Sequence, residues 1–172
     1  MSQEIIIISK RAKKQIENAK EKGYTVIDVT SKGEYKQFSP FYPHGGIPIP
    51  GLKEKSQSVE GVWQGLKVFE NHPIDKTKFD VKNMKNLKRT VRKYGKVLGH
   101  QYKDKVINYV TARKKIYIPA YNYVLENNLQ DDVNKLKEIP KLALLDYDIN
   151  EDIENTAKPL SHASLIKSYL SK

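Results

Sequence analysis

The 172-residue chain contains no cysteine. Disulfide bonds, thiol nucleophiles and cysteine-based metal sites are therefore excluded. Long apolar runs are also lacking, because Ile5–Ile8, the longest near the start, is far shorter than the ~20 residues of a membrane span. No small-residue cleavage pattern follows it. These absences predict a soluble protein of the cytoplasm, or of the host cytoplasm if the source is a virus, without a membrane partner.

Arginine is scarce in a strongly basic chain. Lys and Arg number 31 against 20 Asp and Glu, which gives a formal net charge of +11 and a pI of about 9.6. This balance favours polyanionic partners such as nucleic acid or phosphorylated small molecules. The alternative is a lysine-rich coding bias. Bidentate recognition of phosphates and base edges usually uses arginine, so specific nucleic-acid recognition is the less favoured interpretation.

The four histidines are widely separated along the chain, at His44, His72, His100 and His162. None has the spacing of a metal-ligand motif, and therefore no metal site is predicted. His44 lies beside two glycines and is a candidate for lining a site. His162 is a candidate for a capping or core histidine. No Ser/His/Asp triad is legible in the sequence.

Hydrophobic periodicity predicts more helix than strand. Helices are expected over residues 9–21, 58–71, 79–94, 103–127 (with Pro119 as a kink or break), 129–138 and 159–170. Strands are expected over residues 24–29 and 141–145, and an irregular loop over 31–57 with a short extended piece at 47–49. The class is therefore α+β, mainly helical with a small sheet.

The helix predicted to begin after Ser58 carries a polar stripe. Glu60, Gln64 and Lys67 are spaced i, i+4 and i+7, and on a helix they fall within a sector of roughly 60°. The apolar residues of the same stretch fall on the opposite side. The stripe could face solvent, or it could form one wall of a polar site. The aromatic, proline-rich loop at 38–43 favours the site, because such loops often carry function.

These residues resemble a known signature. The chain has two short motifs separated by a loop: Phe38-Ser39-Pro40-Phe41 and Ser58-x-Glu60-x-x-x-Gln64-x-x-Lys67. They are similar to the signature of the YbiA-like (NADAR) family, which shows Phe-Ser-Asn-Phe and then Ser-x-Glu-His-x-x-Gln-x-x-Lys. The resemblance is clear over residues 24–70 and weaker over 80–170. Pro40 and Gly61 depart from the pattern, and the late Trp of the family is missing. The resemblance implies a divergent branch and a single YbiA-like domain over residues 1–172.

The resemblance also implies an activity. Members hydrolyse N-glycosidic bonds to ribose, in phosphorylated ribosylamino-pyrimidines or in ADP-ribosylated nucleobases, without a metal or other cofactor. Such cleavage passes through an oxocarbenium-like state that a carboxylate can stabilise. Glu60 is the expected catalytic carboxylate, since the first turn of a helix favours the ionised form. Asp148 is the expected second carboxylate, with Asp146 and Asp152 as alternatives.

The remaining candidate residues would bind the substrate. Lys67 would hold a phosphate or ribose hydroxyls, and Gln64 would orient ribose or water. The aromatic candidates for base stacking are Phe41, Tyr42 and Trp63, Ser39 is a ligand or turn residue, and His44 is a wall residue. On the helix predicted over 79–94, a basic line either binds phosphates or is a solvated face; its members are Lys85, Arg89, Arg92 and Lys96.

Three functions therefore stay open. The first is an N-glycosidase whose partner is a ribosylated nucleotide or ADP-ribosylated nucleic acid. The second is a non-enzymatic module that binds ADP-ribose or NAD. The third is a basic nucleic-acid-binding or virion-associated protein.

Overall fold

The computed structural model describes residues 2–172. The chain forms two compact units. Unit 1 combines the N-terminal segment up to Ser39 with Leu125–Lys172, and unit 2 is Pro40–Val124. The class is α+β, as predicted. Among the described residues, no helix has the length and apolar character needed to cross a bilayer.

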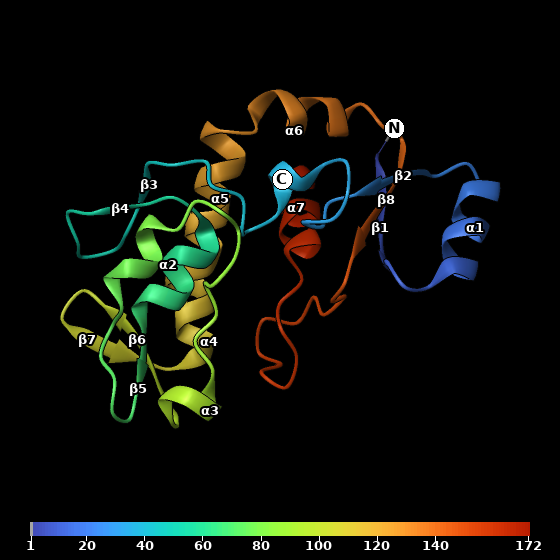
Figure 1. Ribbon diagram of the computed structural model, residues 1–172. Helices are drawn as coiled ribbons and strands as arrows, with labels where there is room; N and C mark the ends of the chain where they lie inside the picture. Colours follow the sequence, from blue (N-terminus) through green and yellow to red (C-terminus); the bar gives the residue numbers. More distant parts are fainter. Residues whose placement is uncertain (1) are drawn as a thin grey trace. The chain divides into compact units, whose positions relative to one another are not determined.

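Unit 1 is built on a parallel three-stranded sheet. The order is β1 (Glu4–Ser9), β8 (Lys141–Asp146), β2 (Thr25–Asp28), so that β8 is central. Leu144 of β8 pairs with Ile7 on one side and with Ile27 on the other. A central parallel strand is covered on both faces, which explains the continuous apolar run of β8. Figure 1 shows α1 (Lys13–Glu21) and α7 (His162–Leu170) on opposite sides of this sheet.

The strands predicted at 24–29 and 141–145 are confirmed in unit 1, as is the helix predicted at 129–138, which is α6 (Gln130–Lys137). The first helix starts later than expected because the chain up to Ser9 forms β1. The last helix begins at His162 rather than at Pro159. A short 3₁₀ turn, η1 (Lys36–Phe38), ends the N-terminal part of this unit.

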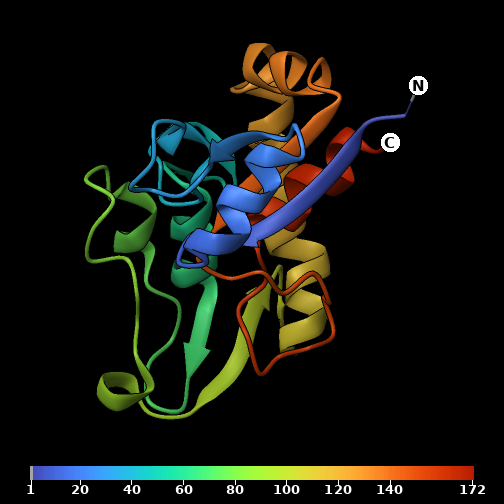
Figure 2. The same ribbon diagram turned by 90° about the vertical axis from the view of Figure 1, so that its right-hand side faces the viewer.

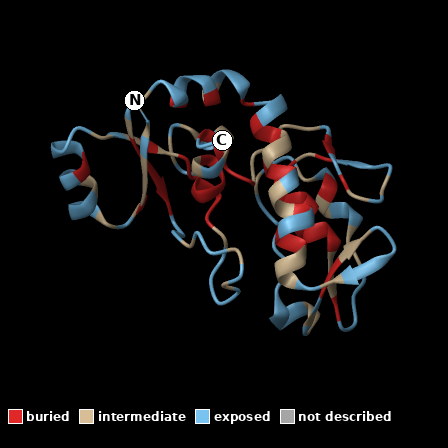
Figure 3. Cartoon of the chain, turned by 180° about the vertical axis from the view of Figure 1, so that it is seen from behind, coloured by how far each residue is buried: buried red, intermediate tan, exposed pale blue. Residues whose placement is uncertain are grey.

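Unit 2 places one helix against an antiparallel meander. The helix is α2 (Val59–Leu66), and the sheet order is β5 (Lys67–Phe69), β6 (Val97–Tyr102), β7 (Lys105–Ile107). Figure 2 shows β5 leading away from α2 and β6 running back in the opposite direction. A two-stranded ribbon of β3 (Ile47–Pro48) and β4 (Lys55–Ser56) confirms the short extended piece expected in the loop. Figure 3 shows α2 as buried along its length.

The long helix predicted over 103–127 is only partly correct. Residues 103–107 belong to the β6–β7 hairpin, in which Lys103 has a φ of 58°. Helical structure follows as α4 (Tyr109–Ala112), a π-helical turn η3 (Arg113–Tyr117) and α5 (Ile118–Asn127). The π-helical turn η3 ends two residues before Pro119, which has no N–H to donate to the hydrogen bonds of the helix. The predicted break at Pro119 thus corresponds to a change of helix type.

The prediction of a helix over residues 79–94 is wrong. The chain forms a 3₁₀ turn, η2 (Lys76–Asp80), then an irregular run, then the single helical turn α3 (Val91–Tyr94). Met84 and Asn86 have φ values of 62° and 60°, which no right-handed helix contains. Gly95, with a φ of 88°, follows α3, so the predicted helix end at residue 94 is confirmed. The predicted basic line therefore does not form one helical stripe.

Candidate functional site

The start of α2 is fixed by two capping contacts. Ser58 is extended, and its Oγ accepts a hydrogen bond of 2.9 Å from the Gly61 N–H. The Pro40 carbonyl accepts a hydrogen bond of 2.8 Å from the Glu60 N–H. The predicted cap is confirmed, and the proline-rich loop is attached to the helix by backbone. Since a backbone carbonyl makes this contact, a proline at position 40 can provide it.

A buried carboxylate lies in the first turn of α2. Glu60 is 8% exposed and Gln64 is 5% exposed, so a solvated polar stripe is ruled out for these two residues. Gln64 Nε2 donates to Glu60 Oε1 at 2.9 Å, and Gln64 Oε1 accepts from the Arg89 N–H at 3.0 Å. The second bond decides which end of the amide is the oxygen, so the NH₂ group faces Glu60. The carboxylate is thereby oriented by a chain of two hydrogen bonds.

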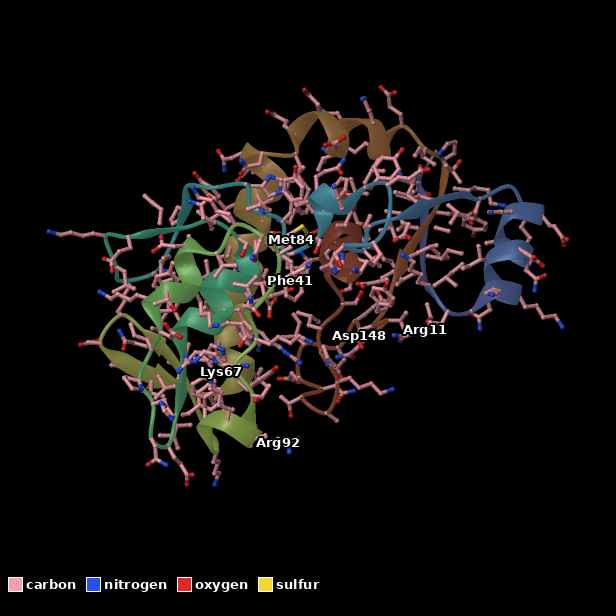
Figure 4. All side chains as sticks on the ribbon, in the orientation of Figure 1. Arg11, Phe41, Lys67, Met84, Arg92 and Asp148 are labelled. Atoms are coloured by element: carbon pink, nitrogen blue, oxygen red, sulfur yellow. The ribbon has the colours of Figure 1, made fainter. Side chains whose placement is uncertain are left out.

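Lys67 does not lie on the helix, contrary to the prediction. The helix ends at Leu66, and Lys67 opens β5 with an extended backbone (φ −66°, ψ 134°). Figure 4 labels its side chain in the region where α2 meets β5. Burial lowers the pKa of the Lys67 ammonium, the charge of Glu60 opposes this shift, and Arg89 adds to it. Glu60 and Lys67 are therefore electrostatically coupled although they lie on different elements.

His100 is a buried imidazole opposite Lys67 in the β5–β6 pair. It is 0% exposed, and neither ring nitrogen has a hydrogen-bond partner within residues 2–172. Burial lowers the pKa of His100 to about 3, and the charges of Lys67 and Arg89 act in the same direction. A backbone group of Trp63 opposes the shift weakly, without hydrogen-bond geometry. The ring is therefore neutral at pH 7.

Trp63 belongs to the core of unit 2. It is 7% exposed, and its ring centroid lies 3.8 Å from that of His100. Tyr109 and Tyr117 contact it edge-on, each at 5.4 Å. The predicted use of Trp63 as a base-stacking surface is therefore wrong, because its ring is enclosed by other rings.

Arg89 is an internal anchor. It is 4% exposed, and its Nη1 donates to the carbonyls of Gln64 (3.0 Å) and Lys67 (2.5 Å). Its Nη2 donates to the Pro73 carbonyl at 2.7 Å. These three bonds direct the guanidinium into the unit, so its predicted role in a phosphate-binding line is wrong. The other members of that line are exposed: Lys85, Arg92 and Lys96.

Two predicted site residues belong to unit 1. Ser39 is buried directly after η1. Asp148 is exposed and lines an open recess of about 610 Å³ in the loop 147–158, beside Glu151 and Asp152. Figure 4 labels Asp148 just beyond the carboxyl end of β8. Its role as a second carboxylate stays a prediction.

The other loop candidates belong to unit 2. Phe41, Tyr42 and His44 are half-buried, and the Tyr42 and His44 rings lie 4.6 Å apart. They follow Pro40 directly, whose carbonyl binds the start of α2. Base stacking by Phe41 and Tyr42 stays a prediction, as does the role of His44 as a residue that lines the site.

Asp146 and His162 form a structural cluster in unit 1. Asp146 Oδ2 accepts from Ser161 Oγ at 2.8 Å and lies 3.1 Å from His162 Nδ1. His162 Nε2 lies 2.8 Å from the Val29 carbonyl. The serine donates to the aspartate rather than to the histidine, so the trio is not a hydrolytic triad. It connects the ends of β8 and β2 to the start of α7, which agrees with the core role considered for His162.

Among residues 2–172, no group of three or more His, Asp or Glu side chains is arranged to hold a metal ion. Sequence reasoning did not identify His100 or the anchoring role of Arg89. Both depend on β6 and on the irregular run before α3. The sequence pattern indicated helix over the irregular run, no element was predicted over β6, and no local signal marked the strand pairing.

Two glycines allow α2 to pack closely on η2. A Cβ at Gly61 would lie 2.6 Å from Ser56 Oγ and 2.8 Å from the Lys78 carbonyl, and one at Gly65 would overlap the Phe79 ring. A histidine at position 61, as in the resembled family, has no room here. We expect Gly65→Ala to lower the free energy of unfolding by about 1–2 kcal/mol, because overpacking exceeds the ~1 kcal/mol gain in helix propensity.

Urea denaturation of Gly65→Ala, Phe79→Leu and the double variant measures this effect. Leucine at position 79 has no ring, so it should relieve the overlap with the Cβ at position 65. The double variant should therefore be more stable than the sum of the two single changes predicts. A Gly65→Ala protein as stable as the wild type would contradict the close approach of the two elements.

One protein family matches nearly the whole chain. No curated protein matches it. A family model matches residues 9–166, from the end of β1 into α7, and so includes both units and the Glu60 site. The chain belongs to this family, described as a family of unknown function (DUF6939).

Proposed function

We propose that the protein is an N-glycosidase of YbiA-like fold. It hydrolyses the bond between ribose and a base in an ADP-ribosylated or phosphoribosylated nucleobase compound. The observation that carries the proposal is the buried Glu60 carboxylate, which Gln64 orients and the Arg89 N–H holds indirectly in place. An acid placed only to stabilise a helix start needs no such support, since exposed first-turn acids do this equally well.

The chemistry follows from the charge that develops on the sugar. The bond from C1′ to the base nitrogen breaks with its electron pair on the base, and the ribose ring becomes positively charged. The Glu60 carboxylate stabilises this charge, or accepts a proton from the water whose oxygen then bonds to C1′. The departing base takes up a proton. Fixed hydrogen bonds in a site of low exposure strengthen such stabilisation, because little reorganisation is needed.

Lys67 supplies the complementary charge. Its ammonium is half-buried and coupled to Glu60, which suits contact with a substrate phosphate or ribose hydroxyl. Phe41 and Tyr42 are the remaining aromatic candidates for the base.

Substitution of Glu60 by glutamine tests the proposal. Wild type is expected to release free base or ADP-ribose from at least one of NAD, ADP-ribosylated guanine DNA and a ribosylamino-pyrimidine phosphate. Glu60→Gln should reduce the rate by about 10²–10⁴-fold, as loss of an acid–base group does. Glu54→Gln is the matched control, because Glu54 is an exposed acid of the same unit.

Two outcomes would oppose the proposal. Turnover by Glu60→Gln at the wild-type rate would remove Glu60 from the mechanism. No turnover by either protein, with ADP-ribose or NAD still raising the melting temperature, would favour the nucleotide-binding module instead.

A further inference from the structure

The whole net charge of the chain lies in unit 2. Residues 40–124 contain seventeen Lys and Arg against six Asp and Glu, a formal net charge of +11. The residues of unit 1 contain fourteen of each and are formally neutral. Charge asymmetry of this kind indicates a polyanionic partner. A general lysine bias would have raised the net charge of both units.

Within unit 2, the charge is concentrated in residues 81–96, which we call the basic segment. It contains no Asp or Glu and seven cations. Six of the cations are exposed, and none of these six forms a salt bridge in the part of the chain that the structure describes: Lys82, Lys85, Lys88, Arg92, Lys93 and Lys96. Figure 4 labels Arg92 at the periphery of α3. Six uncompensated charges close together in sequence repel one another unless an anion is bound.

The basic segment is held in place despite its irregular backbone. The seventh cation, Arg89, binds three carbonyls of α2, β5 and the following loop, while its own N–H binds Gln64. Leu87 is buried beside it. Binding therefore orders little further chain, which favours affinity. Neutral donors alternate with the charges, at Asn83, Asn86 and Thr90.

We propose that the basic segment binds the phosphates of a nucleic-acid backbone. Cations spread along an anchored run of chain suit a repeating row of phosphates better than one phosphate group, and interleaved amides and hydroxyls suit phosphate and sugar oxygens. A membrane surface fits less well, because interfacial binding uses an amphipathic helix, whereas α3 has four residues and Leu87 lies inside the unit. The proposal rests on charge and packing in unit 2 and does not depend on the glycosidase.

Fluorescence anisotropy with unmodified single-stranded and duplex oligonucleotides tests the proposal. For wild type, six phosphate contacts predict a slope of log K against log salt of about −4 on single strands. The variant Lys85→Gln/Arg92→Gln/Lys93→Gln should reduce the slope to about −2. Affinity at low salt should then fall by at least about tenfold.

A matched variant separates a located surface from overall charge. Lys13→Gln/Lys14→Gln/Lys20→Gln removes the same three charges from exposed positions of α1 in unit 1, and it should retain the wild-type slope. Photo-crosslinking of wild type to a halogenated oligonucleotide should label peptides from residues 81–96, which keeps the test valid if a variant folds poorly. Equal losses in both variants, no binding at low salt, or binding to anionic vesicles but not to oligonucleotides would overturn the proposal.

Discussion

Arg89→Met is expected to lower the free energy of unfolding by about 3–4 kcal/mol, because hydrogen bonds from a charged donor are individually strong and three buried or half-buried carbonyls lose that donor. Arg89 joins the carbonyls of Gln64, Lys67 and Pro73 in unit 2. Its guanidinium also lies 4.8 Å from the Phe69 ring centroid. Methionine can replace part of the packing but none of the donors. Urea denaturation measures the loss.

Arg92→Met is the matched control, three positions along the same segment. Arg92 is exposed, so its replacement should change the free energy of unfolding by no more than about 0.5 kcal/mol. Hydrogen exchange should also become faster across residues 81–90 in Arg89→Met alone, because the anchor of this run is lost. Similar stability losses in the two variants would show that Arg89 is not the anchor that its contacts indicate.

Acidification is expected to destabilise the protein through His100. The folded state keeps the imidazole neutral down to a pH of about 3, whereas the unfolded chain takes up a proton below 6.5. Unfolding is therefore coupled to proton uptake in this window, and stability falls as pH falls from 6.5 towards 3. Integrated from pH 7 to pH 4, this one group contributes about 3 kcal/mol.

The comparison of wild type with His100→Phe isolates this contribution. Phenylalanine preserves a ring against Trp63 but does not titrate, so the variant should lose about 3 kcal/mol less than wild type between pH 7 and pH 4. The carboxylates contribute equally to the pH dependence of stability in both proteins. His72→Phe, at an exposed position, should keep the wild-type slope. Parallel pH profiles of wild type and His100→Phe would mean that His100 is protonated in the folded state.

Several features could be predicted from the sequence because their causes are local. Ser58 caps α2 through a backbone N–H three residues away, and Glu60 and Gln64 meet because they are one helical turn apart. Gly95 ends α3 with a positive φ. The strand at residues 141–145 follows from its continuous apolar run. The sequence therefore predicted that Glu60 and Gln64 lie on one face of a helix that begins after Ser58.

Other features were decided only by tertiary structure. An apolar period of three to four residues indicated helix over 79–94, but the segment is anchored instead by Arg89 to carbonyls that lie far from it in sequence. Lys67 leaves the helical stripe because β5 pairs with β6, which places it opposite His100. These contacts join residues that are 16 to 33 positions apart. Local propensity contains no information about such pairings, so the neutral histidine and the anchored basic segment became visible only in the folded chain.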